Sequence, residues 1–327
     1  AIIGSLAGAI ALGVTVLVNS YYNHIIGWTL GYAAMSLTGG YMGQGVDTGA
    51  YFVNYVQNPA MVFTFWIIAL GILYFAVSGG IQKGIEVLAK FMMPTIYLFG
   101  AILIVRTLTL GTPVNPDWSP IAGLNFIWSP RWEDLNWRAA LAAAGQIFFT
   151  LSLGMGIICN YASYLKPDDD IVLSGIATVA LNETAEVIMG GTIAIPIAYT
   201  YLGVAGMQAG VGLSFISLPN IFRVMGGGQI FGFVWFAILA FAGITSAVAM
   251  YNYIVSLLEE SFAMTKKKAS LLVFFLYIAV GMPVALEPIL TKTADLAYFT
   301  EVDNWVGTYL LVVLGGIEAM VVGWLNG

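Results

Sequence analysis

Cysteine and histidine each occur once in the 327 residues, as Cys159 and His24. A single thiol and a single imidazole cannot form a disulfide framework, a CxxC pair or a zinc site with several sulfur and nitrogen ligands. The sequence therefore argues against a redox function and against a structural metal.

Charged residues are also scarce. They make up 9% of the sequence, whereas soluble domains carry about 25%, and hydrophobic residues make up 60%. The formal net charge of −6 includes no basic stripe interleaved with aromatic residues, so no nucleic-acid partner is indicated. This composition excludes an ordinary water-soluble fold and predicts a membrane protein.

Long apolar runs are the abundant feature. A helix needs about 20 mostly apolar residues to cross a bilayer, so the sequence has room for about eight spans. The runs end at turn residues and predict helices at 3–37, 60–78, 86–110, 138–163, 170–200, 230–262, 269–285 and 297–325. We therefore predict an all-α fold, a polytopic membrane helical bundle that forms one domain over 1–327.

Long and short connections alternate between these helices, so the two sets are expected on opposite sides of the membrane. The long connections are 38–59, 111–137 and 201–229, and the short ones are 79–85, 164–169 and 263–268. Basic residues near span ends favour the cytoplasm, and the short connections have Lys83, Lys90, Lys166 and Lys266 to Lys268 in or beside them. We therefore expect the N-terminal end of the sequence on the cytoplasmic side.

The segment 209–229 contains two short amphipathic stretches around Leu218 and Pro219 that are too short to span. We predict a hairpin folded over the outer face, which makes 201–229 an extracellular, lid-like loop. The first apolar run has no basic region before it and is too long for a signal peptide, so we interpret it as a span. Both ends of the sequence fall at apolar runs, and we expect a fragment of a larger bundle.

The segment from Gly145 to Gly156 places small and hydroxyl residues inside a predicted span. Gly154 beside Thr150 and Ser152 lowers helix propensity where lipid penalises open backbone, so a break there must face protein or a cavity. The ends of a broken helix offer amide dipoles to an anion and bare carbonyls to a cation. On this segment alone, a packing face of small residues is an equally good interpretation.

Asn182 and Glu186 form a second pattern inside the span predicted at 170–200. Residues four apart lie on one face of a helix. An acidic side chain at membrane depth is costly unless it is paired, protonated or beside water, so it indicates a functional site. The alternative is a structural cluster of hydrogen bonds that holds neighbouring helices together.

A third pattern runs from Ala242 to Ser246 and includes Thr245. Its hydroxyls could provide oxygen ligands to a hard monovalent cation. Small residues with Ser or Thr more often mark close helix packing, so this pattern is weak by itself.

A fourth pattern is the polar belt from Asn19 to His24 in the first helix. Within it, the Tyr22 hydroxyl could bond a substrate, although tyrosines also occur in interfacial belts or bond a neighbouring carbonyl. We assign His24 no role beyond packing, because the sequence places no acidic partner beside it.

Taken together, these segments resemble the neurotransmitter:sodium symporters. The resemblance rests on Tyr21 and Tyr22 followed by Trp28 to Gly31, on Gly84 and Pro94 with nine residues between them, on Gly145 to Gly156 with Tyr161 to Tyr164, on Leu181 to Glu183, and on Gly243 to Ser246. Their order and spacing match helices 3 to 10 of the family. The resemblance implies an incomplete LeuT-type inverted-repeat fold and a sodium-coupled amino-acid symporter that works by alternating access.

The resemblance also implies roles for individual residues. Tyr22 would donate its hydroxyl to the substrate carboxylate, and Phe149 would close over the substrate. The side-chain pocket would be shaped by Val18, Ser152, Met155, Ala247 and Met250. Two sodium sites, each incomplete here, would use Thr150 and Asn182 for the first ion, and the Ala242 carbonyl, Thr245 and Ser246 for the second.

Glu186 matches the position where chloride-independent bacterial members of the family carry a carboxylate in place of chloride. We therefore predict chloride-independent uptake, because a fixed negative charge would offset the first sodium ion. Met155 stands where several relatives have phenylalanine, and its flexible side chain predicts hydrophobic substrates, including aromatic amino acids.

Gate residues follow from the resemblance in the same way. Asp303 matches an outer-gate acid, and Tyr164 and Glu260 lie where the inner gate is built. Gly84 with Pro94 resembles a motif that helps the inner end of a helix unwind, and a simple loop-to-helix boundary is the alternative interpretation.

Three other classes of function fit the sequence less well. The sequence has no filter-like run of the kind that channels use, and a non-transporting receptor or scaffold would not need polar residues at membrane depth. Both classes are therefore kept only as alternatives to a carrier. No Ser/His pair, HExxH motif or paired aspartates indicate an enzyme. We expect a multi-pass protein of the cell inner (plasma) membrane, with an amino acid and the lipid bilayer as partners and with no oligomeric state predicted.

Overall fold

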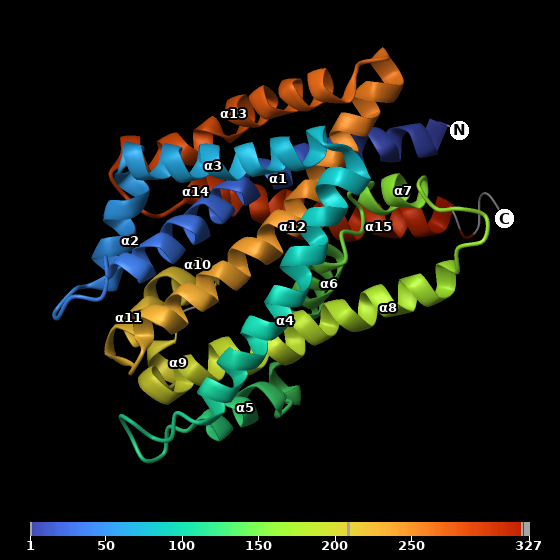
Figure 1. Cartoon of the computed structure of the whole chain (residues 1–327). Helices are drawn as coiled ribbons and strands as arrows, with labels where there is room; N and C mark the ends of the chain where they lie inside the picture. The colour runs from blue at the N-terminus through green and yellow to red at the C-terminus, as the bar shows by residue number, and fades with distance from the viewer. Residues whose placement is uncertain (1, 208–209, 322, 324–327) are drawn as a thin grey trace.

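The computed structural model describes residues 2–207, 210–321 and 323, and all regular structure in these residues is helical (Figure 1). Within them, six helical runs are long and apolar enough to cross a membrane. They are α1 (Ile2–Thr38), α3 (Pro59–Ser78), η1 with α4 (Ile81–Ile85 and Glu86–Leu108), α8 with η3 and α9 (Ile171–Glu183, Thr184–Gly190 and Gly191–Gly206), α12 (Gly228–Phe262) and α13 (Lys266–Thr291). The predicted all-α membrane bundle is confirmed.

The other two predicted spans are not single α-helices. The span predicted at 138–163 is divided into α6 (Trp137–Thr150) and α7 (Ile157–Ala162), which confirms the break expected within 145–156. The span predicted at 297–325 consists of α14 (Ala297–Val302), the π-helical segment η5 (Asp303–Leu310) and α15 (Leu311–Met320). Residues 322, 324 and 325 of that prediction lie outside the described residues.

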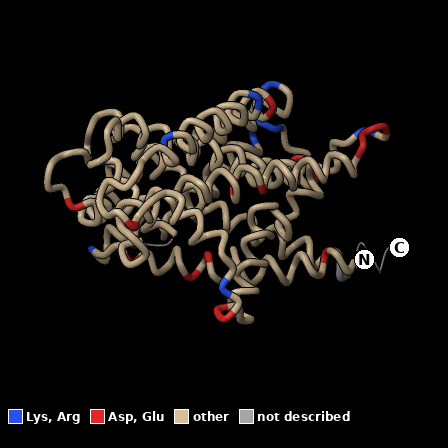
Figure 2. The backbone as a smooth tube through the Cα atoms, turned by 90° about the horizontal axis from the view of Figure 1, so that it is seen from below, with Lys and Arg blue, Asp and Glu red and all other residues tan. Residues whose placement is uncertain are grey.

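The connections lie at two opposite ends of the bundle, as their alternating lengths predict (Figure 1). The turns from α3 to α4, from α7 to α8 and from α12 to α13 lie at the end near the start of α1. Charged residues gather largely in loops and at helix ends, with a few between them (Figure 2). This distribution leaves the helix surfaces mainly apolar, as a bilayer requires.

Helix α1 lies at the centre of the bundle and packs against α12, α3 and α13. Its polar face is buried, with Asn19, Asn23 and His24 no more than 1% exposed. The Nδ1–H of His24 donates to the carbonyl of Ser20 at 2.9 Å, and its ring stacks on Trp66 at a centroid distance of 4.2 Å. These contacts agree with the prediction that His24 is a packing residue.

The long connections contain short helices that the sequence pattern did not predict. They are α2 (Thr48–Gln57), α5 (Pro120–Trp128), the 3₁₀ turn η2 (Trp132–Asp134), and the run of α10, η4 and α11 (Gly210–Gly212, Leu213–Ser217 and Leu218–Val224). Helices of ten residues or fewer are too short to stand out as spans, and their positions depend on what they pack against. In this case α5 packs on α9, and η4 packs on α2.

The hairpin predicted around Leu218 and Pro219 is wrong. The chain stays helical from Gly210 to Val224, and the π-helical segment η4 ends directly before Leu218 and Pro219. Helix α13 also extends beyond its predicted bounds of 269–285 and continues through Pro283 to Thr291. Neighbouring helices and local adjustments make proline tolerable inside membrane helices.

Candidate functional site

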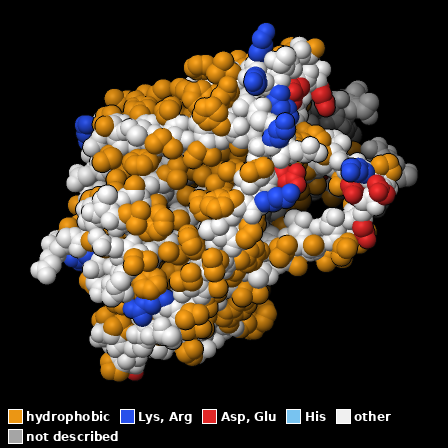
Figure 3. Space-filling model, in the orientation of Figure 1, with side chains coloured by type: hydrophobic (Ala, Val, Ile, Leu, Met, Phe, Trp, Pro, Cys, Tyr) orange, Lys and Arg blue, Asp and Glu red, His pale blue; other side chains and the backbone are white. Residues whose placement is uncertain are grey.

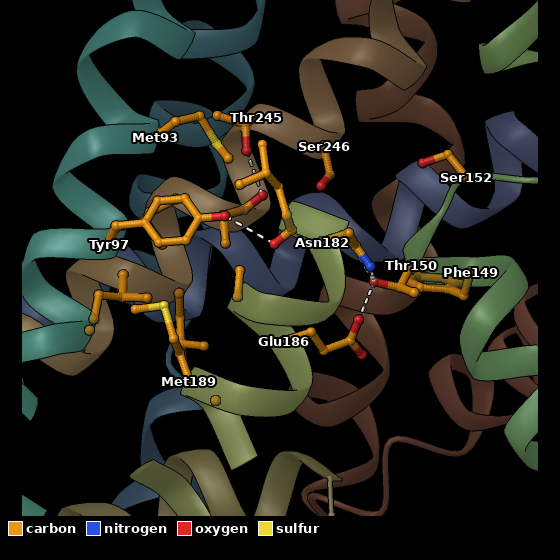
Figure 4. A pocket seen from close by; sticks show the side chains of 18 of the residues that line it. Met93, Tyr97, Phe149, Thr150, Ser152, Asn182, Glu186, Met189, Thr245 and Ser246 are labelled. Carbon is orange, nitrogen blue, oxygen red and sulfur yellow. Dashed lines mark hydrogen bonds between the residues drawn. The ribbon is translucent and has the colours of Figure 1, made fainter. Parts of the chain in front are cut away.

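A cavity of about 680 Å³ lies where the broken α6–α7 segment faces α1, α4, η3 and α12. Most of the residues predicted for the site line it: Tyr22, Phe149, Thr150, Ser152, Met155, Asn182, Glu186, Ala242, Thr245, Ser246 and Met250. Figure 4 shows the side chains of several of them converging from α12, the α8–η3 run and the end of α6. The structure thus brings together residues that are far apart in the sequence.

Two predicted pocket residues do not line this cavity. Val18 and Ala247 are completely buried and belong to the hydrophobic core behind the cavity wall. Their positions on α1 and α12 agree with a supporting role through packing. Sequence alone did not separate lining residues from the layer behind them.

The break in the α6–α7 segment depends on three residues with left-handed backbone. Ser152, Gly154 and Gly156 have φ values of 56°, 72° and 69°. A Cβ atom at position 154 would lie 2.8 Å from the carbonyl oxygen of Leu311, and one at position 156 would lie 2.7 Å from the ring of Tyr253. Glycine is needed at both positions for conformation and for space. Ser152 adopts this conformation at a cost, which is typical of functional sites.

A row of polar side chains crosses the cavity. The Nδ2 of Asn182 donates to the hydroxyl of Thr150 at 3.0 Å, and that hydroxyl donates to the carboxylate of Glu186 (Figure 4). The second carboxylate oxygen of Glu186 accepts a hydrogen bond from the Gln146 amide. A hydroxyl has one proton, so its bond to Glu186 leaves the Asn182 carbonyl oxygen available to a cation.

The helix carrying Asn182 and Glu186 is not regular. It changes from α to π geometry at Thr184, so Glu186 lies in the wider turn η3. Both side chains still contact Thr150, which agrees with the predicted shared face. π-helical turns inside α-helices are frequent at functional sites.

The opposite wall is formed by α12. The hydroxyl of Thr245 donates to the carbonyl of Ala242 at 3.0 Å, and the side chain of Ser246 lies beside it (Figure 4). The rings of Tyr22 and Phe149 lie 6.1 Å apart on the cavity wall. Among the described residues, no group of three His, Cys, Asp or Glu side chains could hold a metal ion. The hydroxyl, amide and carboxylate oxygens suit a small hard cation better than a soft metal.

Gln146 and Tyr97 are two of the lining residues that were not assigned from the sequence. Gln146 lies four residues before Thr150, and that helical spacing was the available signal. Tyr97 on α4 donates its hydroxyl to the carbonyl of Leu181 at 2.9 Å, directly before Asn182. No spacing rule connects two helices in this way, so only the fold shows the contact.

The predicted gate residues lie outside the cavity lining. Asp303 accepts a hydrogen bond of 2.6 Å from Tyr21, the residue before Tyr22. The hydroxyl of Tyr164 lies 2.9 Å from that of Ser256 on α12, and exposed Glu260 follows one turn later. The structure therefore places Tyr164 and Glu260 near the C-terminal end of α12, whereas Asp303 contacts the middle of α1.

Gly84 and Pro94 lie in one continuous helical run. Gly84 belongs to the π turn η1, and a Cβ atom there would lie only 1.8 Å from the carbonyl oxygen of Ala76. The glycine therefore permits close contact between η1 and the end of α3. Pro94 lies inside α4, so both residues are helical in this structure and their unwinding stays a prediction.

The sequence model that describes the sodium:neurotransmitter symporter family matches residues 52–327 of this chain. The chain belongs to this family. The family consists of transporters, so the expectation that the chain is not part of an enzyme is confirmed.

Relatives of this symporter chain include uncharacterised sodium-dependent transporters. That of Methanocaldococcus jannaschii is 31% identical over 331 residues, which cover 95% of this chain and 64% of the relative. YhdH of Bacillus subtilis is 31% identical over 285 residues, covering 86% of this chain and 60% of the relative. The chain therefore spans less than two thirds of the length of these curated relatives.

A solved structure confirms the fold of this family member. The crystal structure of MhsT in complex with L-phenylalanine matches 98% of this chain and 71% of its own chain, with a TM-score of 0.85 and 30% sequence identity. The LeuT-type fold predicted from the sequence is therefore confirmed. Together with six span-length apolar helices, the family establishes a multi-pass membrane protein.

Proposed function

We propose that this chain is part of a sodium-coupled symporter of hydrophobic and aromatic L-amino acids that works by alternating access without chloride. The observation that carries the proposal is the cavity itself. It joins an aromatic and methionine wall to a row of oxygen-bearing side chains, in a chain that belongs to a sodium symporter family. The matched structure, MhsT, was solved with L-phenylalanine.

The substrate would lie between Tyr22 and Phe149. The Tyr22 hydroxyl can donate to a carboxylate, and the Phe149 ring, 6.1 Å away, can cover an amino acid from the side. Ser152, Met155 and Met250 complete the lining, with Val18 and Ala247 packed behind it. Methionine adapts to irregular shapes, so this wall favours bulky apolar side chains.

Two sodium ions would occupy opposite sides of the cavity. The first would be held by the side chains of Thr150 and Asn182, and the second by the Ala242 carbonyl with Thr245 and Ser246. These groups supply only oxygen ligands, which fits a hard cation. Each set is smaller than a full coordination shell, so further ligands would come from other parts of the whole protein.

Glu186 would supply the negative charge near the first sodium ion. Its carboxylate accepts hydrogen bonds from Thr150 and Gln146, which hold it beside the proposed ligands of that ion. A fixed carboxylate beside the first sodium ion removes the need for a mobile chloride ion there. We therefore propose that chloride is not required.

The gates and the orientation complete the proposal. Asp303 would belong to the outer gate, Tyr164 and Glu260 to the inner gate, and Gly84 with Pro94 would let the inner end of α4 unwind. The loop 201–229 would act as an extracellular lid, with the lysine-rich end of the bundle in the cytoplasm and the protein in the inner (plasma) membrane. The 1–327 region would act as one transporter domain.

Uptake by the full-length protein in proteoliposomes tests this function. Labelled phenylalanine should accumulate with an inward sodium gradient and not with potassium, and tryptophan and leucine should compete far better than glycine. Exchange of chloride for gluconate should leave uptake unchanged. Preference for glycine would contradict the substrate class, and loss of uptake in gluconate would contradict chloride independence.

Saturable counterflow separates the symporter from the alternatives. A carrier preloaded with unlabelled phenylalanine should transiently concentrate the labelled amino acid. A channel would show no counterflow, and a receptor would bind phenylalanine without any flux. Either result would overturn the proposal.

A further inference from the structure

A second cavity of about 680 Å³ lies between α3 and the η1–α4 run. Its α3 wall includes Ile68, Gly71 and Phe75, and its α4 wall includes Val87 and Phe91. Residues on each wall repeat every three or four positions, so the cavity follows both helices as a groove. Its volume lies within the range of about 300–1,000 Å³ that is typical of ligand pockets. We call it the α3–α4 groove.

The α3–α4 groove has large apolar side chains exposed along both walls. Ile68, Phe75, Val87 and Phe91 are 45%, 73%, 58% and 62% exposed. Gly71 leaves the floor open, because a Cβ atom there would have no neighbour within 4 Å. Hydrophobic side chains also cover much of the molecular face in Figure 3. In a membrane protein such walls fit an apolar chain and not water.

One charged residue lines the groove. Lys83 lies in η1 at the turn from α3 to α4, at the lysine-rich end of the bundle, and its side chain is exposed. The nearby carboxylate of Glu86 pairs instead with Lys90 at 2.7 Å. In the part of the chain that the structure describes, no carboxylate forms an ion pair with Lys83. The Lys83 ammonium is therefore available to an anion at the end of an apolar groove.

We propose that the α3–α4 groove binds one acyl chain of an anionic phospholipid whose phosphate pairs with Lys83. A lysine at the end of a span reaches the headgroup level, while the groove below it follows the direction of the acyl chains. Lipid tails are already in an apolar solvent, so burial in the groove gives little selectivity by itself. Preference among lipids must come from the charge on Lys83, and one lysine near an anionic headgroup is worth about a fivefold change in affinity.

Lipid binding to the purified full-length protein tests this proposal. Native mass spectrometry in detergent would follow titration with phosphatidylglycerol or phosphatidylethanolamine of identical acyl chains. The first phosphatidylglycerol should bind about fivefold more tightly than the first phosphatidylethanolamine. Lys83→Gln should abolish that preference, whereas Lys90→Gln, which alters a paired lysine on the same run outside the groove, should retain it.

A second variant tests the groove and not the charge. Gly71→Leu places a side chain in the open floor, so it should weaken binding of both lipids at the groove. Equal binding of the two lipids to the wild type would overturn the proposal. So would an equal effect of Lys83→Gln and Lys90→Gln, or unchanged lipid binding by Gly71→Leu. These measurements do not depend on transport, so they are independent of the proposed symport function.

Discussion

The hydroxyl of Tyr21 lies 2.6 Å from a carboxylate oxygen of Asp303 and donates a hydrogen bond to it. This bond joins α1 to the start of η5, and the ring of Phe299 packs edge-on against Tyr21 at 5.2 Å. Tyr22, the next residue, lines the cavity proposed to bind the substrate. One short segment of α1 therefore contacts the proposed outer-gate acid and lines the proposed substrate cavity.

Tyr21→Phe tests this connection. It removes the donor and leaves the ring, so the Asp303 carboxylate loses a charge-assisted hydrogen bond worth about 1.5–3 kcal/mol. If that bond orients the gate, the maximal uptake rate should fall about tenfold or more, which corresponds to ~1.4 kcal/mol. The control is Tyr309→Phe, which changes a partly exposed tyrosine in η5, the segment that begins with Asp303. An unchanged uptake rate in Tyr21→Phe would show that the bond has no part in gating.

Glu186→Ser should make transport depend on chloride. The substitution removes the fixed charge beside the proposed first sodium site, so an external anion is needed to offset the ion. Uptake would be measured in chloride and in gluconate. Glu183→Gln removes an acid from the same helix at a position that does not line the cavity, and it should transport equally well in both salts. Full uptake by Glu186→Ser in gluconate would refute the role of Glu186.

Thr150→Val should weaken sodium activation. The valine has nearly the same shape but lacks the hydroxyl that bridges Asn182 and Glu186, so one proposed ligand is lost and Asn182 loses its partner. Loss of a ligand worth ~1.4 kcal/mol raises the sodium concentration for half-maximal uptake about tenfold. Thr184→Val removes a hydroxyl that bonds only within its own helix, at Ala180, and should leave sodium activation near that of the wild type. Equal sodium curves for both variants would argue against the site.

Gly156→Ala should destabilise the broken segment. The added methyl group meets the ring of Tyr253 at 2.7 Å, and φ of 69° is unfavourable for alanine. The left-handed conformation alone costs about 1–2 kcal/mol, so the melting temperature should fall. Gly175→Ala, in α8 where a Cβ atom has open space, should leave it unchanged or raise it because alanine favours helix. A melting temperature for Gly156→Ala at or above that of Gly175→Ala would contradict this account of the break.

The sequence predicted the spans because membrane helices need long apolar runs, and it predicted the break because glycine and serine cluster near Ser152. It also indicated that Asn182 and Glu186 share a face, because four-residue spacing is a local property of a helix. The short helices in the long connections were not predictable in this way. Helix α5, for example, has only nine residues, too few for a span, and it is positioned by its packing on α9.

The sequence by itself determined the membrane class, the positions of the spans, the polar residues at membrane depth and the family resemblance, since all of these depend on composition or on spacing along one helix. Only the tertiary structure placed the Thr150 hydroxyl between Asn182 and Glu186, and only it moved Val18 and Ala247 behind the cavity wall. It also placed Lys83 at the end of a groove between two helices. Contacts between helices depend on their relative rotation and on close packing of side chains, and a periodicity within one helix contains neither.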